Sequence, residues 1–296
     1  MAYQLEKGEP LLKGIYRIGK EEQKATLAAL STIEDPHKGI HQARKHLKKL
    51  RALIRLIRDQ LGRNSYKDGN IYYRDIGRHL AALRDITSLI EISIQLQEQY
   101  AQIIGHEGFE HLLQLLTQER KRIQKEKPQK QLFKKEVQLI KKDKTRFTKP
   151  SKPVYSIENA LKSLTRVYKR GVRGFQKAQI LPEAEGMHDW RKRVKYLWHH
   201  FQLIEQAWPA LMICYIEILK NLADELGDYH DLALLQEKTQ LLKKNLPEGF
   251  AKKLWKIAEK EKKNKLSEAL NLGQLIYAER PKAFRRRMAV IIKCFK

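Results

Sequence analysis

The chain has 296 residues, enough for one large domain or two ordinary ones. Its 60 Lys and Arg against 34 Asp and Glu give a formal charge of +26, which destabilises a compact state by self-repulsion unless an anionic partner is bound. That charge is typical of proteins that bind nucleic acid, an anionic membrane surface or another polyanion. The two cysteines exclude a disulfide framework and a cysteine-rich metal site.

The first twenty residues lack an apolar signal core, and no stretch approaches the roughly 20 apolar residues that span a bilayer. The sequence therefore predicts a soluble, cytoplasmic protein that is not inserted in a membrane.

Apolar residues recur with helical spacing in nearly every long segment, and no run alternates as a strand would. The pattern predicts an all-α fold of about ten helices. Two prolines and no apolar run in residues 149–156 favour a boundary near 150, with one helical bundle in residues 1–150 and a second in 151–296. Other breaks are expected at Asp35-Pro36, Gly62 to Gly69, Gly105 to Gly108, Lys127-Pro128, Leu181-Pro182, Trp208-Pro209, Leu246-Pro247 and Arg280-Pro281.

The two halves are a divergent repeat. Residues 41–50 (HQARKHLKKL) match residues 188–197 (HDWRKRVKYL) at an offset of 147, which is 188 − 41. Residues 80–86 (LAALRDI) match residues 226–232 (LGDYHDL) at an offset of 146, which is 231 − 85. We infer two homologous antiparallel bundles and expect a pseudo-two-fold axis between them, because identical folds most often pair that way.

Each half carries a helix with one apolar face and one cationic face, since residues advance by about 100° along a helix. Cations at these spacings repel one another, so an ordinary wet surface would intersperse acids, and none occurs from residue 40 to 58. We therefore interpret both faces as parts of an anion-binding site rather than as solvated surface. The first face consists of His41, Arg44, Lys45, Lys48, Arg51 and Arg55, and the second of His188, Arg191, Lys192, Lys195 and His199.

Two further helices of each half add cations. The helix after each cationic face contributes Arg74, Arg78 and Arg84 in the first half and Lys220 and His230 in the second. The opening helices contribute Arg17 in the first half and, in the second, Arg166, Lys169, Arg170 and Arg173.

Asp85 and Asp231 occupy matching positions beside the predicted site. Each carboxylate could orient a neighbouring guanidinium or imidazole group through a charge-assisted hydrogen bond. An ordinary salt bridge between packed helices explains each Asp equally well. Both interpretations make the two residues supporting ones.

The order of these motifs resembles the CHAD family, the α-helical domain named for its characteristic histidines. The resemblance rests on His41-x-x-Arg44-Lys45, on its counterpart beginning at His188, on the Arg84-Asp85 and His230-Asp231 pairs, and on Tyr168-Lys169-Arg170-Gly171. It implies two facing bundles around a basic groove or pore that binds inorganic polyphosphate, association with polyphosphate granules and with other polyphosphate-associated proteins, and a stand-alone domain, because the Glu-x-Glu-x-Lys signature of the CYTH domain is absent.

No signature of an enzyme is present. The sequence has no phosphate-binding Gly-rich loop, nucleophile elbow or clustered acids for Mg²⁺, and its ten histidines lack metal-binding spacing. We expect a non-enzymatic protein without a metal or cofactor.

Single-stranded RNA or DNA is the alternative ligand, because phosphate backbones attract the same Lys and Arg side chains. Binders of single strands usually interleave stacking aromatic residues with the cations, whereas the first cationic face has none and the second offers mainly Trp198. The pattern favours polyphosphate, which has no bases to stack.

Overall fold

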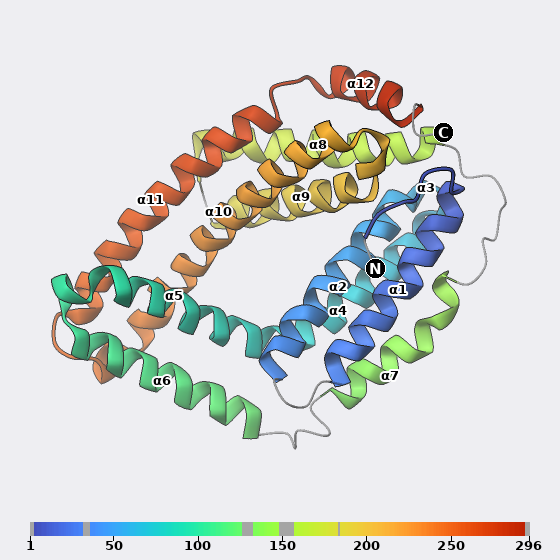
Figure 1. Ribbon diagram of the computed structural model, residues 1–296. Coiled ribbons are helices and arrows are strands. Elements are labelled where there is room, and N and C mark those ends of the chain that lie inside the picture. Colours follow the sequence, from blue (N-terminus) through green and yellow to red (C-terminus); the bar gives the residue numbers. More distant parts are fainter. Residues whose placement is uncertain (1–2, 32–35, 126–132, 148–156, 183, 294–296) are drawn as a thin grey trace.

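The computed structural model describes residues 3–31, 36–125, 133–147, 157–182 and 184–293. Within these ranges the chain forms twelve α-helices and no strand, which confirms the predicted all-α fold (Figure 1). The boundary predicted near residue 150 lies outside the described residues and stays a prediction, as do the breaks at Asp35 and at Lys127-Pro128.

The helices of the first half form a bundle around α2. Here α1 and α4 pack against α2, and α7 packs against α1 and α4. Of the remaining helices, the short α3 contacts α2 and α4, while α5 and α6 pair with each other away from the bundle (Figure 1). The helices of this half are α1 (Leu11–Ser31), α2 (Pro36–Leu56), α3 (Arg58–Leu61), α4 (Arg63–His79), α5 (Ala81–Ile104), α6 (His106–Lys125) and α7 (Lys134–Lys142).

The second half repeats this order. Helices α8 and α10 pack against α9, α12 packs against α8, and α11 runs along α10. The two cationic faces lie on α2 and α9, and these helices contact each other, as α5 and α10 do. Contact between equivalent helices is what a pseudo-two-fold axis produces. The helices of this half are α8 (Ile157–Ile180), α9 (Ala184–Leu203), α10 (Pro209–Leu241), α11 (Phe250–Ile276) and α12 (Pro281–Lys293).

Most predicted helix ends are confirmed, including those before Pro182, Pro209, Pro247 and Pro281. The two glycine-bounded breaks are shorter than predicted. At each break only one glycine separates two helices. These are Gly62 and Gly105, with φ +78° and +102°, values that glycine adopts because it has no Cβ to clash. Residues 63–69 and 106–108 are helical instead.

A break at Leu80 separates α4 from α5, whereas the equivalent segment of the second half lies inside the continuous α10. This break was not predicted, because no proline lies nearby and Gly77, three residues earlier, is still within α4. The first half therefore turns where the second runs straight.

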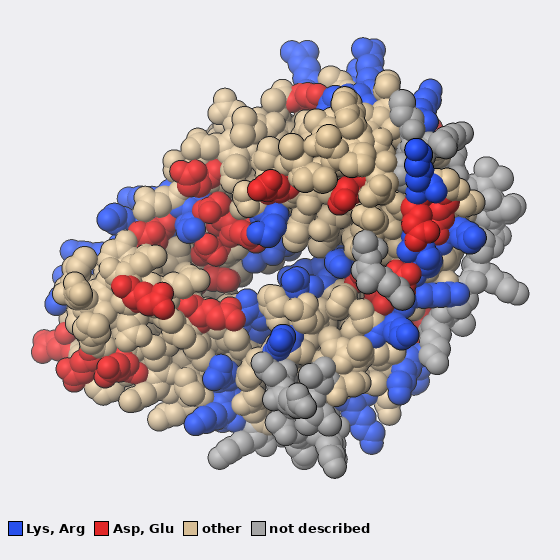
Figure 2. Space-filling view, in the orientation of Figure 1, with Lys and Arg blue, Asp and Glu red and all other residues tan. Residues whose placement is uncertain are grey.

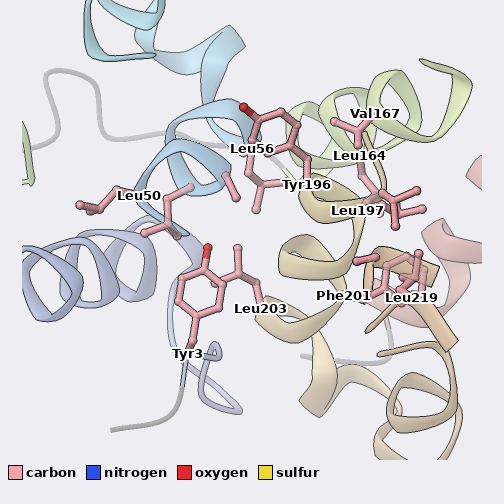
Figure 3. Close-up of a cluster of buried hydrophobic side chains, with 14 of the residues drawn as sticks. Tyr3, Leu50, Leu56, Leu164, Val167, Tyr196, Leu197, Phe201, Leu203 and Leu219 are labelled. Atoms are coloured by element: carbon pink, nitrogen blue, oxygen red, sulfur yellow. The ribbon is translucent and has the colours of Figure 1, made fainter. Parts of the chain in front are cut away.

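The main hydrophobic core is shared by both halves (Figure 3). Leu50 and Leu56 of α2 belong to the same buried cluster as Leu197 and Phe201 of α9. Main-chain contacts reinforce it: the Leu5 amide donates to the Leu203 carbonyl at 2.9 Å, and His200 Nε2 lies 3.0 Å from the Ala52 carbonyl oxygen. This continuous core fixes the α2 and α9 faces relative to each other.

A second core lies between α5, α6, α11 and the end of α10. The Phe109 and Phe250 rings meet edge to face there, with centroids 5.3 Å apart. Two cores hold the helices around the opening near the middle of the molecule, whose edges carry Lys and Arg side chains (Figure 2).

Candidate functional site

The cationic side of α2 is held in place by the opposite side of the helix. Ala43, Leu47 and Leu50 are almost completely buried, which leaves Arg44 and Lys48 on the other arc. The same division holds on α9, where Trp190 and Val194 are fully buried. Amphipathic spacing therefore directs both cationic faces away from the main core.

The two faces converge at a pair of lysines. Desolvation, together with the positive charge of Arg191, lowers the pKa of Lys195 to about 7. Desolvation also lowers the pKa of Lys48 well below its ordinary value, with Lys195 and Arg191 as the strongest charged neighbours. Cations of α2 and α9 thus repel one another across the interface between the halves.

Two arginines flank these lysines. Arg44 donates from Nη1 to the Gly77 carbonyl oxygen at 2.6 Å. On the equivalent face, a Cβ at Gly227 would lie 3.2 Å from Arg191 Nη2, so the glycine lets this guanidinium lie close against α10. Desolvation lowers the pKa of both Arg44 and Arg191. Both side chains are held against a helix while their charges stay poorly solvated.

Arg84 of α5 completes the arrangement. Its charge is among those that lower the pKa of Lys48, Arg191 and His41. Arg84 Nη1 also binds Glu91 at 2.8 Å, an ion pair whose carboxylate is half exposed. We define the central basic cluster as His41, Arg44, Lys48, Arg84, His188, Arg191, Lys195 and His230, contributed by α2, α5, α9 and α10.

Three histidines of the cluster are neutral at pH 7. Desolvation, together with the charges of Arg84 and Lys45, lowers the pKa of His41 to about 4. Desolvation and Lys192 lower the pKa of His188 to about 4, and the His230 ring lies 5.3 Å away, centroid to centroid. No hydrogen bond joins His41 or His188 to Asp85 or Asp231 among the described residues. Within the ranges that the structure describes, Asp85 and Asp231 therefore do not orient these two imidazole groups through a direct hydrogen bond.

Asp85 and Asp231 counter the cluster through space. Desolvation raises the pKa of each carboxyl group, while Arg44 lowers that of Asp85 and Arg191 that of Asp231. The Asp231 charge also raises the pKa of Asp85. Both Asp85 and Asp231 thus act on the cluster through their negative charge, and their supporting role stays a prediction.

Lys45 and Lys192 are exposed at the edge of the cluster. Their charges lower the pKa of His41 and His188, respectively. Lys192 Nζ lies 3.0 Å from Asp189 Oδ1, an exposed pair that a polyanion can displace.

Four predicted site residues are bound to carboxylates outside the cluster. Arg17 donates to both oxygens of Glu9, at 2.9 and 2.7 Å, and its pKa is raised by that contact. The other three lie on helix surfaces: Arg74 Nε is 2.8 Å and Arg78 Nη1 3.7 Å from Asp75 Oδ1, and Lys220 Nζ is 3.2 Å from Asp224 Oδ2. The structure places these residues outside the central cluster, each beside a local carboxylate that the helical arcs did not reveal, and their role in binding stays a prediction.

His199 is buried and does not lie on the open part of the α9 face. It is only 5% exposed, its ring stacks on Trp198 at 4.9 Å, and Tyr3 contacts it edge on. Burial lowers its pKa to about 3. The N-terminal segment covers this end of α9, so His199 packs instead of facing a ligand.

The remaining predicted residues gather away from the centre. Arg55 and Arg170 line one pocket, and Arg170 and Arg173 line a neighbouring groove. Arg51 lies between the two regions, donating to Asn70 Oδ1 at 3.2 Å. Lys169 is exposed on α8. We define the outer arginine cluster as Arg55, Arg58, Arg166, Arg170 and Arg193.

Sequence reasoning did not assign Arg58 or Arg193 to a site. A signal for Arg58 exists, because it continues the helical spacing of Arg51 and Arg55 beyond the end of α2. No comparable signal exists for Arg193, which faces away from Arg191 on the same helix. Its place depends on the packing of α8 against α9.

In the described ranges, no group of three or more His, Cys, Asp or Glu residues is arranged to hold a metal ion. None of the helices described there has the length and apolar character needed to cross a bilayer.

Comparisons with known proteins agree with this architecture. The crystal structure of the CHAD domain from the plant Ricinus communis superimposes with a TM-score of 0.55 over 95% of this chain and 96% of that one, at 15% sequence identity, which indicates a shared fold. No curated protein sequence matches the chain. The family model of the CHAD domain matches residues 21–240, so the chain belongs to the CHAD domain family.

Proposed function

We propose that the central basic cluster binds inorganic polyphosphate. The carrying observation is that α2 and α9 contact each other and bring Lys48 and Lys195 to the junction of the two halves, where both amines are desolvated beside other cations. A chain of phosphates between them would replace the missing solvation and reverse the repulsion. The cluster should thus be more stable with a bound polyanion than without one.

The family supports the same ligand, because CHAD domains are associated with polyphosphate binding. The duplicated construction suits a long, repetitive ligand, since the faces of α2 and α9 offer equivalent contacts to successive phosphates. Flexible Lys and forked Arg donors can each neutralise a separate phosphate.

Single-stranded nucleic acid is the second candidate, because it carries the same phosphate charge. The aromatic rings near the cations are already engaged: Arg55 lies over the Tyr196 ring at 4.1 Å, and Trp198 stacks on His199. Tyr196 is buried and one face of Trp198 is covered, which leaves little of the aromatic surface that stacks on bases. This favours polyphosphate over RNA or DNA.

The protein acts in this proposal as a non-enzymatic binder that needs no cofactor. Recruitment to polyphosphate granules and contact with other polyphosphate-associated proteins would follow from the same cluster, since a long chain can engage several proteins at once.

Competition at fixed salt tests the proposal. Labelled long-chain polyphosphate is bound to the protein and displaced with unlabelled polyphosphate, RNA, DNA or orthophosphate at equal phosphate concentration. We expect polyphosphate to displace the label best and orthophosphate worst, because only a chain engages the cations together. Equal displacement by RNA would refute the choice of ligand, and equal displacement by orthophosphate would refute an extended site.

A further inference from the structure

The outer arginine cluster gathers five guanidinium groups from four helices around one small pocket. Arg55 ends the cationic face of α2, Arg58 begins α3, and Arg193 comes from α9. Arg166 and Arg170 lie one helical turn apart on α8. These residues are distant in sequence and meet only through the packing of both halves.

The cluster has a deficit of negative charge. Among the described residues, Asp59 is the carboxylate in contact with it, 3.2 Å from Arg166 Nη2 and 3.8 Å from Arg58 Nε. Desolvation lowers the pKa of Arg170, and the charges of Arg193, Arg55 and Arg58 lower it further. One carboxylate cannot balance five cations, so the pocket favours an additional anion.

Hydrogen-bond donors around the pocket also lack partners. Arg55 is 7% exposed and Ser163 is 1% exposed, yet Arg55 Nε and Ser163 Oγ are buried without a hydrogen bond in the described part of the chain. Arg166 Nη1 is in the same state. All three residues line the pocket. Buried donors are normally satisfied, so three orphans at one pocket indicate an absent acceptor.

The pocket is separate from the central basic cluster. The Tyr196 ring lies 4.1 Å from the Arg55 guanidinium carbon, and the Tyr66 ring faces it at 5.6 Å. The cations that most affect Lys48 are Lys195, Arg191, Arg44 and Arg84, all central, whereas the cations that act on Arg170 are Arg193, Arg55 and Arg58, all from the outer cluster. The cations thus form two electrostatic groups with Arg51 between them.

Size and access restrict the ligand. The pocket encloses only about 10 Å³, room for roughly one water-sized atom, so one oxygen of a phosphoryl group enters it and the rest of the group lies outside. Arg170 and Arg193 also line an adjoining open groove, through which solvent reaches the pocket. Arg side chains bind tetrahedral oxyanions through two parallel N–H donors, which suits a single phosphoryl group.

We propose that the outer arginine cluster is a second anion site, distinct from the central basic cluster, that binds one terminal phosphoryl group through Arg55, Arg166, Arg170 and Ser163. The group belongs either to free orthophosphate or to the end of a polyphosphate chain. The first source requires no ligand at the central cluster.

Calorimetric titration with orthophosphate tests the site. Arg166→Gln with Arg170→Gln removes two donors of the outer cluster, and Lys252→Gln with Lys256→Gln, on the exposed side of α11, is the charge-matched control outside both clusters. We expect the outer variant to bind orthophosphate at least tenfold more weakly and the control variant to bind it as the wild type does. Circular dichroism verifies that both variants fold.

Equal weakening in the two variants, or wild-type binding by the outer variant, would overturn the proposal, as would the lack of a saturable site in the wild type. Arg166→Lys with Arg170→Lys guards against a folding artefact, because it keeps the charge but loses the forked donors and should bind with intermediate affinity.

Long-chain polyphosphate with free or chemically capped ends then identifies the source of the phosphoryl group. A preference of the wild type for free ends that disappears in the outer variant assigns the site to chain termini. No preference, with orthophosphate binding intact, assigns it to free orthophosphate. Both assignments stand even if the central cluster fails to bind polyphosphate, because the orthophosphate titration does not depend on it.

Discussion

The cationic face of α2 is longer than that of α9. His41, Arg44 and Lys48 have direct counterparts in the second half, and both sets join the central basic cluster. One turn further, α2 presents Arg51 and Arg55. At the offset of 147, α9 presents Trp198 and Gln202 there.

This difference divides the predicted site. Where the repeat keeps its cations, the halves meet and build one symmetric cluster from both sides. Where it does not, Trp198 packs against His199, while Arg55 turns to the arginines of α8 and α9. Duplication therefore explains the centre, and divergence at the ends of α2 and α9 explains the second site.

The largest loss of polyphosphate affinity is expected when the cations common to the α2 and α9 faces are replaced. Arg44→Glu with Arg191→Glu replaces one arginine on each face by a repelling acid. Loss of two charge-assisted contacts at roughly 1.5–3 kcal/mol each predicts that polyphosphate binds at least about 100-fold more weakly. A displacement titration measures the change.

The control is Lys252→Glu with Lys256→Glu, on the exposed side of α11. It changes the net charge by the same amount on a helix that contributes no residue to the central basic cluster. Polyphosphate affinity should therefore change little. Equal losses in the two variants would show that net charge alone attracts the ligand.

The amphipathic faces of α2 and α9 could be predicted from sequence because helical periodicity separates Leu47 and Val194 from the cations around them. The internal repeat predicted that the two faces pair. Helical periodicity and the repeat together were enough to place the cations of α2 and α9 in one central cluster.

Tertiary contacts decided the rest. Arg17 has the position of a site residue on its helix, but the preceding segment brings Glu9 to it. His199 lies on the cationic arc of α9, but Tyr3 covers it. Periodicity describes which way a side chain points and not what another segment places against it. The division of the arginines into two clusters was hidden for the same reason, since it depends on the rings of Tyr66 and Tyr196.

The next largest effect is the pH dependence of polyphosphate affinity that the two central lysines produce. Desolvation and neighbouring cations depress the pKa of Lys195 to about 7 in the free protein, so this amine loses its proton as pH rises above 7. A bound polyanion raises that pKa, and binding then takes up a proton. Affinity should fall as pH rises from 7 to 9, by up to about tenfold per pH unit for each lysine involved.

Lys48→Arg with Lys195→Arg isolates this effect, because guanidinium groups keep their charge throughout that range. Affinity measured at pH 6, 7, 8 and 9 should be nearly constant in the variant. A variant that is as sensitive to pH as the wild type would show that other groups carry the dependence.

A smaller effect tests whether the extra length of the α2 face contributes to chain binding. Arg51→Gln removes one cation from the region between the clusters and should lower the slope of log affinity against log salt by about 0.7, one phosphate contact on a flexible chain. Affinity itself should fall by less than the double charge reversal. Trp198→Phe, at the equivalent place on α9, should leave the slope unchanged, and a shift in that variant instead would assign the longer contact to α9.

The smallest effect is expected at the two histidines that open the faces. The pKa of both His41 and His188 is held at about 4 by desolvation and nearby cations. A bound phosphate raises these pKa values again, so protonation should strengthen binding only below about pH 6.5, the reference value of the imidazole. The two halves should differ, because the His230 ring beside His188 opposes a second charge and His41 has no such neighbour among the charges acting on it.

His41→Gln and His188→Gln, each made in the Lys48→Arg, Lys195→Arg background, remove the lysine titration and leave that of the imidazole. Between pH 6.5 and 5.5 the background protein should gain affinity by a factor below ten, and most of the gain should disappear with His41→Gln. Thermal melting of each variant separates ligand contact from packing, since a packing histidine would lower the melting temperature and leave the pH dependence intact. If His188→Gln removes more of the gain than His41→Gln, the His188 and His230 rings take up protons together. The expected difference between His41 of α2 and His188 of α9 is then wrong.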